Sequence, residues 1–176
     1  MEGSDAKPHA AWYAVHVRSN QERVTSELLA ARGVELFFPT YRVASKRADR
    51  RVVLSRPLFT GYVFVHLDPS SEQRVAVLRA PGVVRFVGFG DAPTKVPDET
   101  IRSLRILVEE SGGTARPHPL VREGQRVAVV DGCFRGAVGV LHVSEGRKPR
   151  LIVEVEFLGR AVAVPISPEQ VQPLLS

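Results

Sequence analysis

Apolar residues in the first two thirds of the chain alternate between β-type runs and helical stripes. The β-type runs are rich in β-branched and aromatic residues, and they occupy residues 12–17, 34–43, 57–65 and 83–89. The run at 57–65 contains no charged residue, so both of its faces are apolar. One face can serve the core of its own domain, and the other needs a helix or a partner as a cover. We expect this run to be the strand around which the chain is organised.

Helical stripes separate these runs, and each begins at a residue suited to capping a helix. Ser19 with Glu22, and Ser70 with Gln73, match the capping box, in which the two side chains satisfy free backbone N–H groups. Asp98 is the expected cap of a third helix. These signals predict where three helices begin.

The first helix should pack through a stripe of apolar residues, Val24, Leu28 and Ala31, which recur at helical spacing, and Leu29 widens this stripe. Strands interleaved with about three helices predict an α+β fold for residues 11–109, an antiparallel sheet flanked by the helices. Residues 1–10 are mostly small and polar, and we expect them to form a disordered lead-in.

Beyond this domain the pattern changes to short β-type runs without a helical stripe. Residues 110–120 contain two glycines and two prolines and are expected to form a linker. Turn signals such as Asp131-Gly132 then separate four runs, which occupy residues 125–130, 138–143, 151–157 and 161–165. This pattern predicts a small all-β barrel of the SH3-like kind at 121–176.

Positive charge gathers in one loop. The chain of 176 residues has a net charge of +5, and residues 42–56 alone hold six arginines and lysines against Asp49. Such a loop suits the phosphates of a nucleic acid, although a solvated hairpin would have the same composition. The candidate nucleic-acid contacts are Lys46, Arg47, Arg50 and Arg51.

Patterns typical of catalysis or metal binding do not occur in the sequence. The five histidines are scattered, the single cysteine has no base placed beside it, and Gly88-Phe-Gly90 lacks the third glycine of a dinucleotide-binding turn. We therefore expect no enzyme, no cofactor and no metal site. A lone cysteine, and the absence of a signal segment or membrane span, favour a cytoplasmic protein, which we expect to be a monomer.

Two regions of the chain resemble parts of one known family. The C-terminal runs contain a pattern that resembles the KOW motif, Gly124-x-x-Val127-x-Val129-x-x-Gly132-x-Phe134-x-Gly136-x-x-Gly139. The first domain resembles the N-terminal domain of the NusG family of transcription elongation factors. The matching pieces are Trp12-Tyr13, Glu22, Phe38-Pro39, 58–65 and Gly82-Val-Val-Arg-Phe86. Together the two resemblances cover residues 11–175, which is nearly the whole chain.

Within the family, residues 57–69 look more like the specialised antiterminators of the RfaH and UpxY types than like housekeeping NusG. Two positions depart from the family pattern, because Thr60 and Cys133 each stand where proline is usual. Neither departure removes an aromatic residue.

The resemblance implies a transcription elongation or antitermination factor that suppresses pausing or termination. Its N-terminal domain would dock on the clamp helices of RNA polymerase through Leu58, Phe59, Tyr62, Phe64, Trp12 and Tyr13. The basic loop would lie near non-template or upstream DNA. The KOW domain would recruit a small-subunit ribosomal protein, with Rho as a competing partner, through Phe134, Leu158 and Arg160.

Tyr62 and Phe64 lie two residues apart and should share one face of a strand, with Phe59 close by. We expect these aromatics to form an exposed interaction patch, so Phe59→Ala should lose polymerase binding while the melting temperature stays near that of the wild type. Phe134 could equally be a core residue of the barrel. Two other functions stay open: a housekeeping NusG role that includes aid to Rho, and a ribosome-associated RNA-binding protein with a KOW domain.

Overall fold

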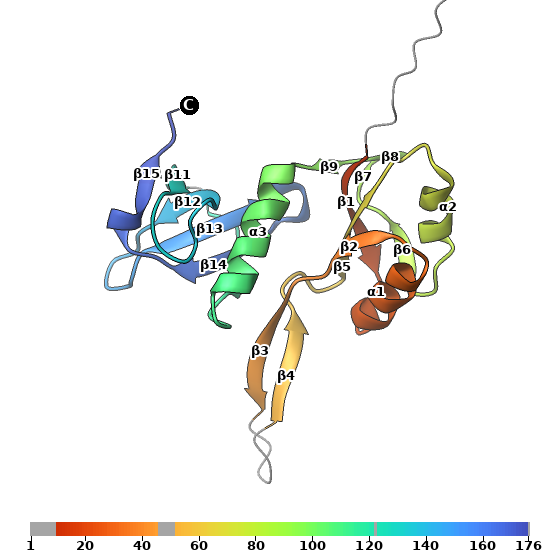
Figure 1. Ribbon diagram of the computed structural model, residues 1–176, viewed down its shortest axis with the longest axis horizontal. Helices are drawn as coiled ribbons and strands as arrows, with labels where there is room; N and C mark the ends of the chain where they lie inside the picture. Colours follow the sequence, from red (N-terminus) through yellow and green to blue (C-terminus); the bar gives the residue numbers. More distant parts are fainter. Residues whose placement is uncertain (1–9, 46–51, 122, 176) are drawn as a thin grey trace, which may run out of the picture. The chain divides into compact units, whose positions relative to one another are not determined.

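The structure is a computed structural model that describes residues 10–45, 52–121 and 123–175 (Figure 1). The chain divides into two compact units. The first combines Met1–Phe38 with Gly61–Val96, and the second combines Pro39–Thr60 with Pro97–Ser176. The second unit therefore contains residues 39–60 and the helix at Asp98–Glu110 together with the C-terminal strands. The domain boundaries expected from the sequence stay a prediction.

An antiparallel sheet forms the frame of the first unit. Its strand order is β2-β5-β1-β6, with the short β9 also paired to β1. The strands are β1 (Ala11–Val17), β2 (Glu35–Phe37), β5 (Tyr62–Leu67), β6 (Val83–Phe86) and β9 (Lys95–Val96). A small hairpin of β7 (Gly88–Phe89) and β8 (Ala92–Pro93) follows β6.

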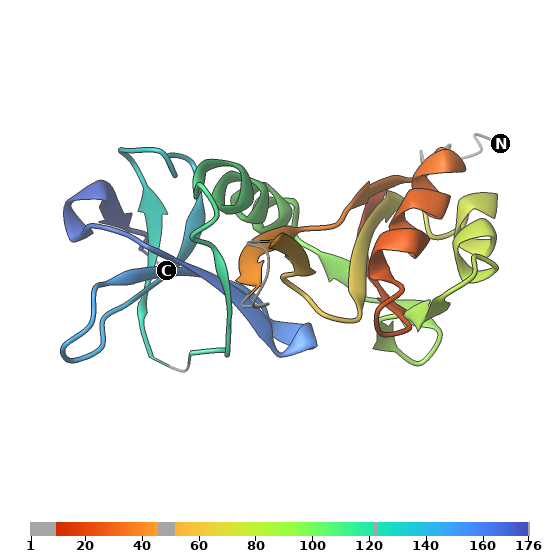
Figure 2. The ribbon, with the colours of Figure 1, turned by 90° about the horizontal axis from the view of Figure 1, so that it is seen from below.

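Two helices cover one face of this sheet. They are α1 (Glu22–Ala31) and α2 (Glu72–Leu78), which lie near each other in both views (Figures 1 and 2). Leu29 of α1 and Val77 of α2 join the apolar cluster on this face, together with Tyr13, Val15, Val17, Val63, Val65 and Leu67 of β1 and β5. Burial, and then the negative charge of Asp68, raise the pKa of the Tyr13 hydroxyl above its ordinary value.

The predicted capping boxes are wrong. Gln21 and Ser71 occupy the N-cap positions of α1 and α2, and neither side chain caps its helix. The carboxylate of Glu22 is engaged elsewhere, as an acceptor for the backbone N–H of Gly61. The side chain of Ser70 donates to Asp68 in the preceding turn. The side chains expected to cap the helices therefore make other hydrogen bonds, Glu22 to a distant turn and Ser70 within its own turn.

The apolar stripe expected for α1 is confirmed only at Leu29, because Leu28 is half-buried and Ala31 is exposed. Val24 is 57% exposed, and the buried positions of the helix are Glu22, Thr25, Ser26 and Leu29. The third predicted cap differs as well, because Asp98 is the first residue of its helix and Pro97 is the N-cap. The run predicted as one strand at 34–43 is two strands, since the chain leaves the sheet at Phe38 and Pro39, and proline has no N–H for a β ladder.

The second unit contains a hairpin, a helix and an all-β sheet. The hairpin consists of β3 (Thr40–Ser45) and β4 (Val52–Pro57), and the helix is α3 (Asp98–Glu110). Six antiparallel strands follow in the order β10-β14-β13-β12-β11-β15. They are β10 (Arg116–His118), β11 (Gln125–Val129), β12 (Val138–His142), β13 (Arg150–Val155), β14 (Arg160–Pro165) and β15 (Val171–Pro173), with short 3₁₀ turns at Glu156–Leu158 and Pro168–Gln170.

The predicted fold class, an α+β part and a small all-β part, is confirmed. Strand β10 lies inside the stretch expected to be a linker and pairs with β14. Helix α3 is attached to this sheet, because the side-chain oxygen of Ser103 accepts the backbone N–H of Val138 at 2.8 Å and Arg126 pairs with Glu99. No helix in the described part of the chain is both long and apolar enough to cross a membrane.

Candidate functional site

The face of the first unit's sheet opposite α1 and α2 carries the aromatic residues singled out in the sequence. Because side chains alternate along a strand, Trp12 of β1 shares this face with Tyr62 and Phe64 of β5. Tyr13 points to the other face, where it belongs to the apolar cluster. Leu58 and Phe59 precede β5 and belong to the second unit. The structure therefore brings three of the six predicted polymerase contacts onto one sheet face.

Aromatic rings meet across neighbouring strands at two levels of this face. In the middle, Phe64 packs on Phe37 of β2 with ring centroids 6.2 Å apart. At one end, Trp12 packs on His66 at 5.0 Å. His66 Nδ1 also lies 2.8 Å from a carboxylate oxygen of Glu35. Such tilted ring pairs are favourable contacts, so these strands are held together by side chains as well as by the β ladder.

A third level of the same face forms what we call the edge row, defined as Tyr62, His16 and Arg85. The rings of Tyr62 and His16 lie 5.6 Å apart at an interplanar angle of 37°. Arg85 of β6 is the cross-strand neighbour of His16 and is exposed. Tyr62 and His16 are half-buried. The edge row thus joins an aromatic pair to a cation at a solvent-accessible margin.

The expected exposed patch of aromatics is wrong for all but Tyr62. Phe64 is fully buried, Trp12 is 6% exposed, and Phe59 is 1% exposed. Leu58 is equally buried, at 2%. The physical reason is visible in the sequence, since a strand that is apolar on both faces is stable only when both faces leave water. Among the described residues of this face, the edge row is accessible at one end, and His66 and Glu35 are accessible at the other.

The basic loop itself, with Lys46, Arg47, Arg50 and Arg51, lies outside the described residues. The strands that carry the loop are described, and Arg42 of β3 is paired with Ser55 of β4. Arg42 forms no ion pair within the described part of the chain. The contacts of the loop cations remain a sequence prediction.

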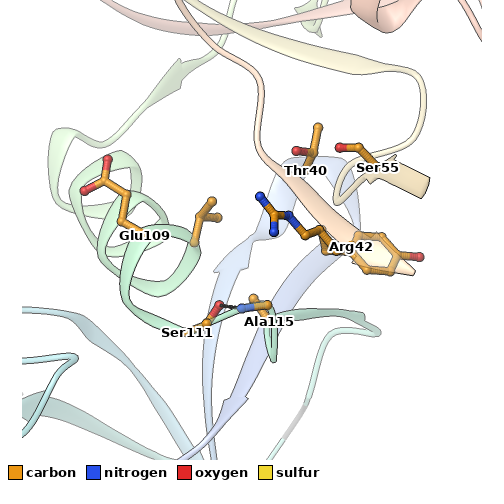
Figure 3. A pocket seen from close by; sticks show the side chains of 10 residues that line it. Thr40, Arg42, Ser55, Glu109, Ser111 and Ala115 are labelled. Atoms are coloured by element: carbon orange, nitrogen blue, oxygen red, sulfur yellow. Dashed lines mark hydrogen bonds between the residues drawn. The ribbon is translucent and has the colours of Figure 1, made fainter. Parts of the chain in front are cut away.

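An open pocket of about 520 Å³ lies between the base of this hairpin and the end of α3. Figure 3 shows Arg42 reaching into it, with Thr40 and Ser55 on the same side. The opposite wall includes Glu109 and Ser111. The guanidinium of Arg42 and the hydroxyls of Thr40, Ser55 and Ser111 offer hydrogen-bond donors of the kind that an oxyanion accepts.

The candidate partner contacts of the C-terminal sheet differ in accessibility. Phe134, in the turn between β11 and β12, is 8% exposed and is therefore packed. Leu158 is half-buried and Arg160 is exposed, and they flank Gly159, whose φ of +64° makes a left-handed turn. In the described residues no three histidine, cysteine, aspartate or glutamate side chains lie close enough to hold a metal ion.

Sequence reasoning missed three residues that shape the face. His16 and Arg85 join the edge row through cross-strand pairing, and Glu22 holds the turn before Tyr62. His16 and Arg85 are neighbours only through the pairing register of β1 and β6, which the folded sheet sets and a single sequence does not show. The sequence had drawn attention to Glu22 through the family resemblance and the capping-box match, but the capping box assigned its side chain the wrong partner.

Comparison with known proteins gives a consistent result over nearly the whole chain. Residues 10–105 match the sequence model of the family described as "Transcription termination factor nusG". The chain is 31% identical over 177 residues to the "Transcription termination/antitermination protein NusG" of Vibrio cholerae serotype O1, which covers 95% of this chain and 97% of the relative. The protein of the same name from Escherichia coli strain K12 is 30% identical over 175 residues, with coverages of 94% and 97%.

A solved structure, "Domain interaction in Thermotoga maritima NusG", has a similar fold. Its sequence is 22% identical to this chain, and the two superpose with a TM-score of 0.51 over 95% of this chain and 98% of that one.

Proposed function

The chain belongs to the NusG family of transcription termination and antitermination proteins, and from this premise we propose that it docks on RNA polymerase through the edge row. As a family member it is a transcription elongation and antitermination factor that acts with RNA polymerase. The observation that supports the edge row is its composition, an aromatic pair beside a cation at an accessible margin of a face on which Trp12 and Phe64 are buried. Tyrosine and arginine are among the residue types most enriched at energetically dominant contacts.

The partner surface we propose is the tip of the polymerase clamp helices, as the family resemblance implies. Trp12, Phe64, Leu58 and Phe59 are buried, so their contribution is to hold the shape of the chain around the contact. Binding energy at this position would keep the elongation complex in its active arrangement and suppress pausing or termination. The mechanism is one of positioning and involves no covalent step.

Tyr62→Ala is expected to weaken binding of the full chain to RNA polymerase core about thirtyfold, which is roughly 2 kcal/mol. The measurement is a titration of labelled protein with core enzyme, combined with a melting curve for each variant. Phe89→Ala is the matched control, because Phe89 is a highly exposed aromatic of the same unit outside this face. Normal affinity of a well-folded Tyr62→Ala protein would place the docking surface elsewhere.

We also propose that the basic hairpin loop contacts DNA in the elongation complex. Replacing Lys46, Arg47, Arg50 and Arg51 together by glutamate is expected to weaken binding to an assembled elongation complex at low salt. The loss should shrink as salt rises, because contacts to phosphates release counterions. Binding to core enzyme without nucleic acid serves as the control and should change little. Equal affinity of both proteins at low salt would leave the loop as a solvated hairpin.

For the second unit we propose that the C-terminal sheet recruits a small-subunit ribosomal protein, with Rho as a competitor. Leu158 and Arg160 would supply the accessible contact at the turn before β14, and the packed ring of Phe134 would support its own turn. The housekeeping role, with aid to Rho-dependent termination, is the second candidate function. It is favoured by the relatives named above, which are termination/antitermination proteins.

A further inference from the structure

Helix α1 buries a carboxylate in its first turn. Glu22 is only 4% exposed, and its Oε1 accepts the backbone N–H of Gly61 at 2.9 Å across 39 residues of sequence. Within the described residues it has no ion-pair partner. Burying a charged group is costly unless hydrogen bonds compensate, so the placement of this carboxylate against the turn before β5 needs an explanation.

The Gly61 turn is held from two sides. While its N–H donates to Glu22, its carbonyl oxygen accepts the backbone N–H of Val17 at 2.9 Å. Gly61 has a φ of +83°, a left-handed conformation that other residues adopt only with strain. The peptide units on both sides of Gly61 are therefore fixed, and they set the direction in which β5 leaves at Tyr62.

The turn before β6 is also held from two sides, by the backbone that follows β1 and by a side chain of α1. The backbone N–H of Arg18 donates to Gly82 O at 2.8 Å, and the hydroxyl of Thr25 donates to Pro81 O at 3.2 Å. A side chain at Gly82 would collide with Thr25, since its Cβ would lie 2.3 Å from Oγ1. The polar face of α1 thus holds the starts of the two strands that carry the edge row.

We propose that Glu22 is a positioning residue for polymerase docking. By accepting the Gly61 N–H it sets Tyr62 against His16, and together with Thr25 it keeps Arg85 at the same margin. This role rests on the proposed function of the edge row. It explains why a carboxylate, and not an apolar side chain, occupies a buried position on α1.

Two substitutions at one site separate positioning from stability. Glu22→Met fills the space and removes the acceptor, so the buried Gly61 N–H is left without its partner and some folding stability is lost. Glu22→Gln keeps an acceptor oxygen. Ser26→Ala is the control, because Ser26 is equally buried and its hydroxyl donates to Glu22 O of its own helix.

In the free full-length chain, hydrogen exchange of the Gly61 amide reports the contact directly. We expect Glu22→Met to speed this exchange at least about tenfold relative to the wild type, because the amide loses its partner. Glu22→Gln and Ser26→Ala should leave it within about threefold. An unchanged Gly61 amide in Glu22→Met would overturn the inference before any partner is added.

Binding of each variant to RNA polymerase core then tests the docking role at a temperature where all are folded. Glu22→Met is expected to bind about tenfold more weakly than wild type, whereas Glu22→Gln and Ser26→Ala bind normally. If Tyr62→Ala binds weakly and Glu22→Met binds normally, the positioning role is refuted while the proposed function stands. If wild type itself fails to bind, the proposed function falls and the docking role with it, and the exchange data still decide whether Glu22 holds the turn.

Discussion

Phe59→Ala is expected to lower the free energy of unfolding by about 3 to 5 kcal/mol. The Phe59 side chain is 1% exposed, and truncating a fully buried phenylalanine leaves a cavity in addition to the lost burial. For a chain of this length each kcal/mol shifts the melting temperature by roughly 2 to 4 °C. Urea unfolding and thermal melting of the full chain measure the effect.

This result would replace the sequence-based expectation for the same substitution, which was an intact fold without polymerase binding. Thr60→Ala is the control, because Thr60 is the exposed neighbour of Phe59 and its truncation should change stability little. Binding is then compared only at temperatures where Phe59→Ala remains folded. A melting curve that matches the wild type would mean that Phe59 is not packed as the structure has it.

Gly139→Ala is expected to destabilise the C-terminal sheet by roughly 3 kcal/mol, at the upper end of the usual cost of overpacking. A Cβ at this position of β12 would lie 2.4 Å from the carbonyl oxygen of Ile152 on the neighbouring β13. Backbone atoms cannot rotate away as a side chain can, so the two strands would have to separate. Urea unfolding of the full chain, with circular dichroism of the β signal, measures the loss.

Gly146→Ala provides the comparison for this prediction. Gly146 has a φ of +68° and no atom within 4 Å of an added Cβ, so only the left-handed backbone is penalised. That penalty is about 1 to 2 kcal/mol. If Gly139→Ala and Gly146→Ala lose the same free energy of unfolding, the close approach between β12 and β13 does not explain why the KOW motif has a glycine at position 139.

The sequence alone determined the β5 strand and the C-terminal all-β fold. The run at 57–65 is apolar on both faces, and in the structure its strand is buried on both faces. The turn signal at Asp131-Gly132 is also met, because Gly132 has a φ of +83°, a left-handed conformation that favours glycine. The motif glycine Gly139 lies against the backbone of the neighbouring strand, where a side chain would not fit. Such features are local or depend on composition, so a single sequence contains them.

The tertiary structure alone decided which side chains reach solvent and which polar groups are buried. Alternation along β5 predicted that Tyr62 and Phe64 share a face, but only the packing leaves Tyr62 half-buried and Phe64 at 0% exposure. On α1, Val24 faces solvent while Glu22 is buried, because the helix docks through hydrogen bonds to a turn 39 residues away. The periodicity of a sequence reports only the hydrophobicity of one segment. The burial of the Glu22 carboxylate depends on the N–H of Gly61, which lies beside it only after the sheet has formed.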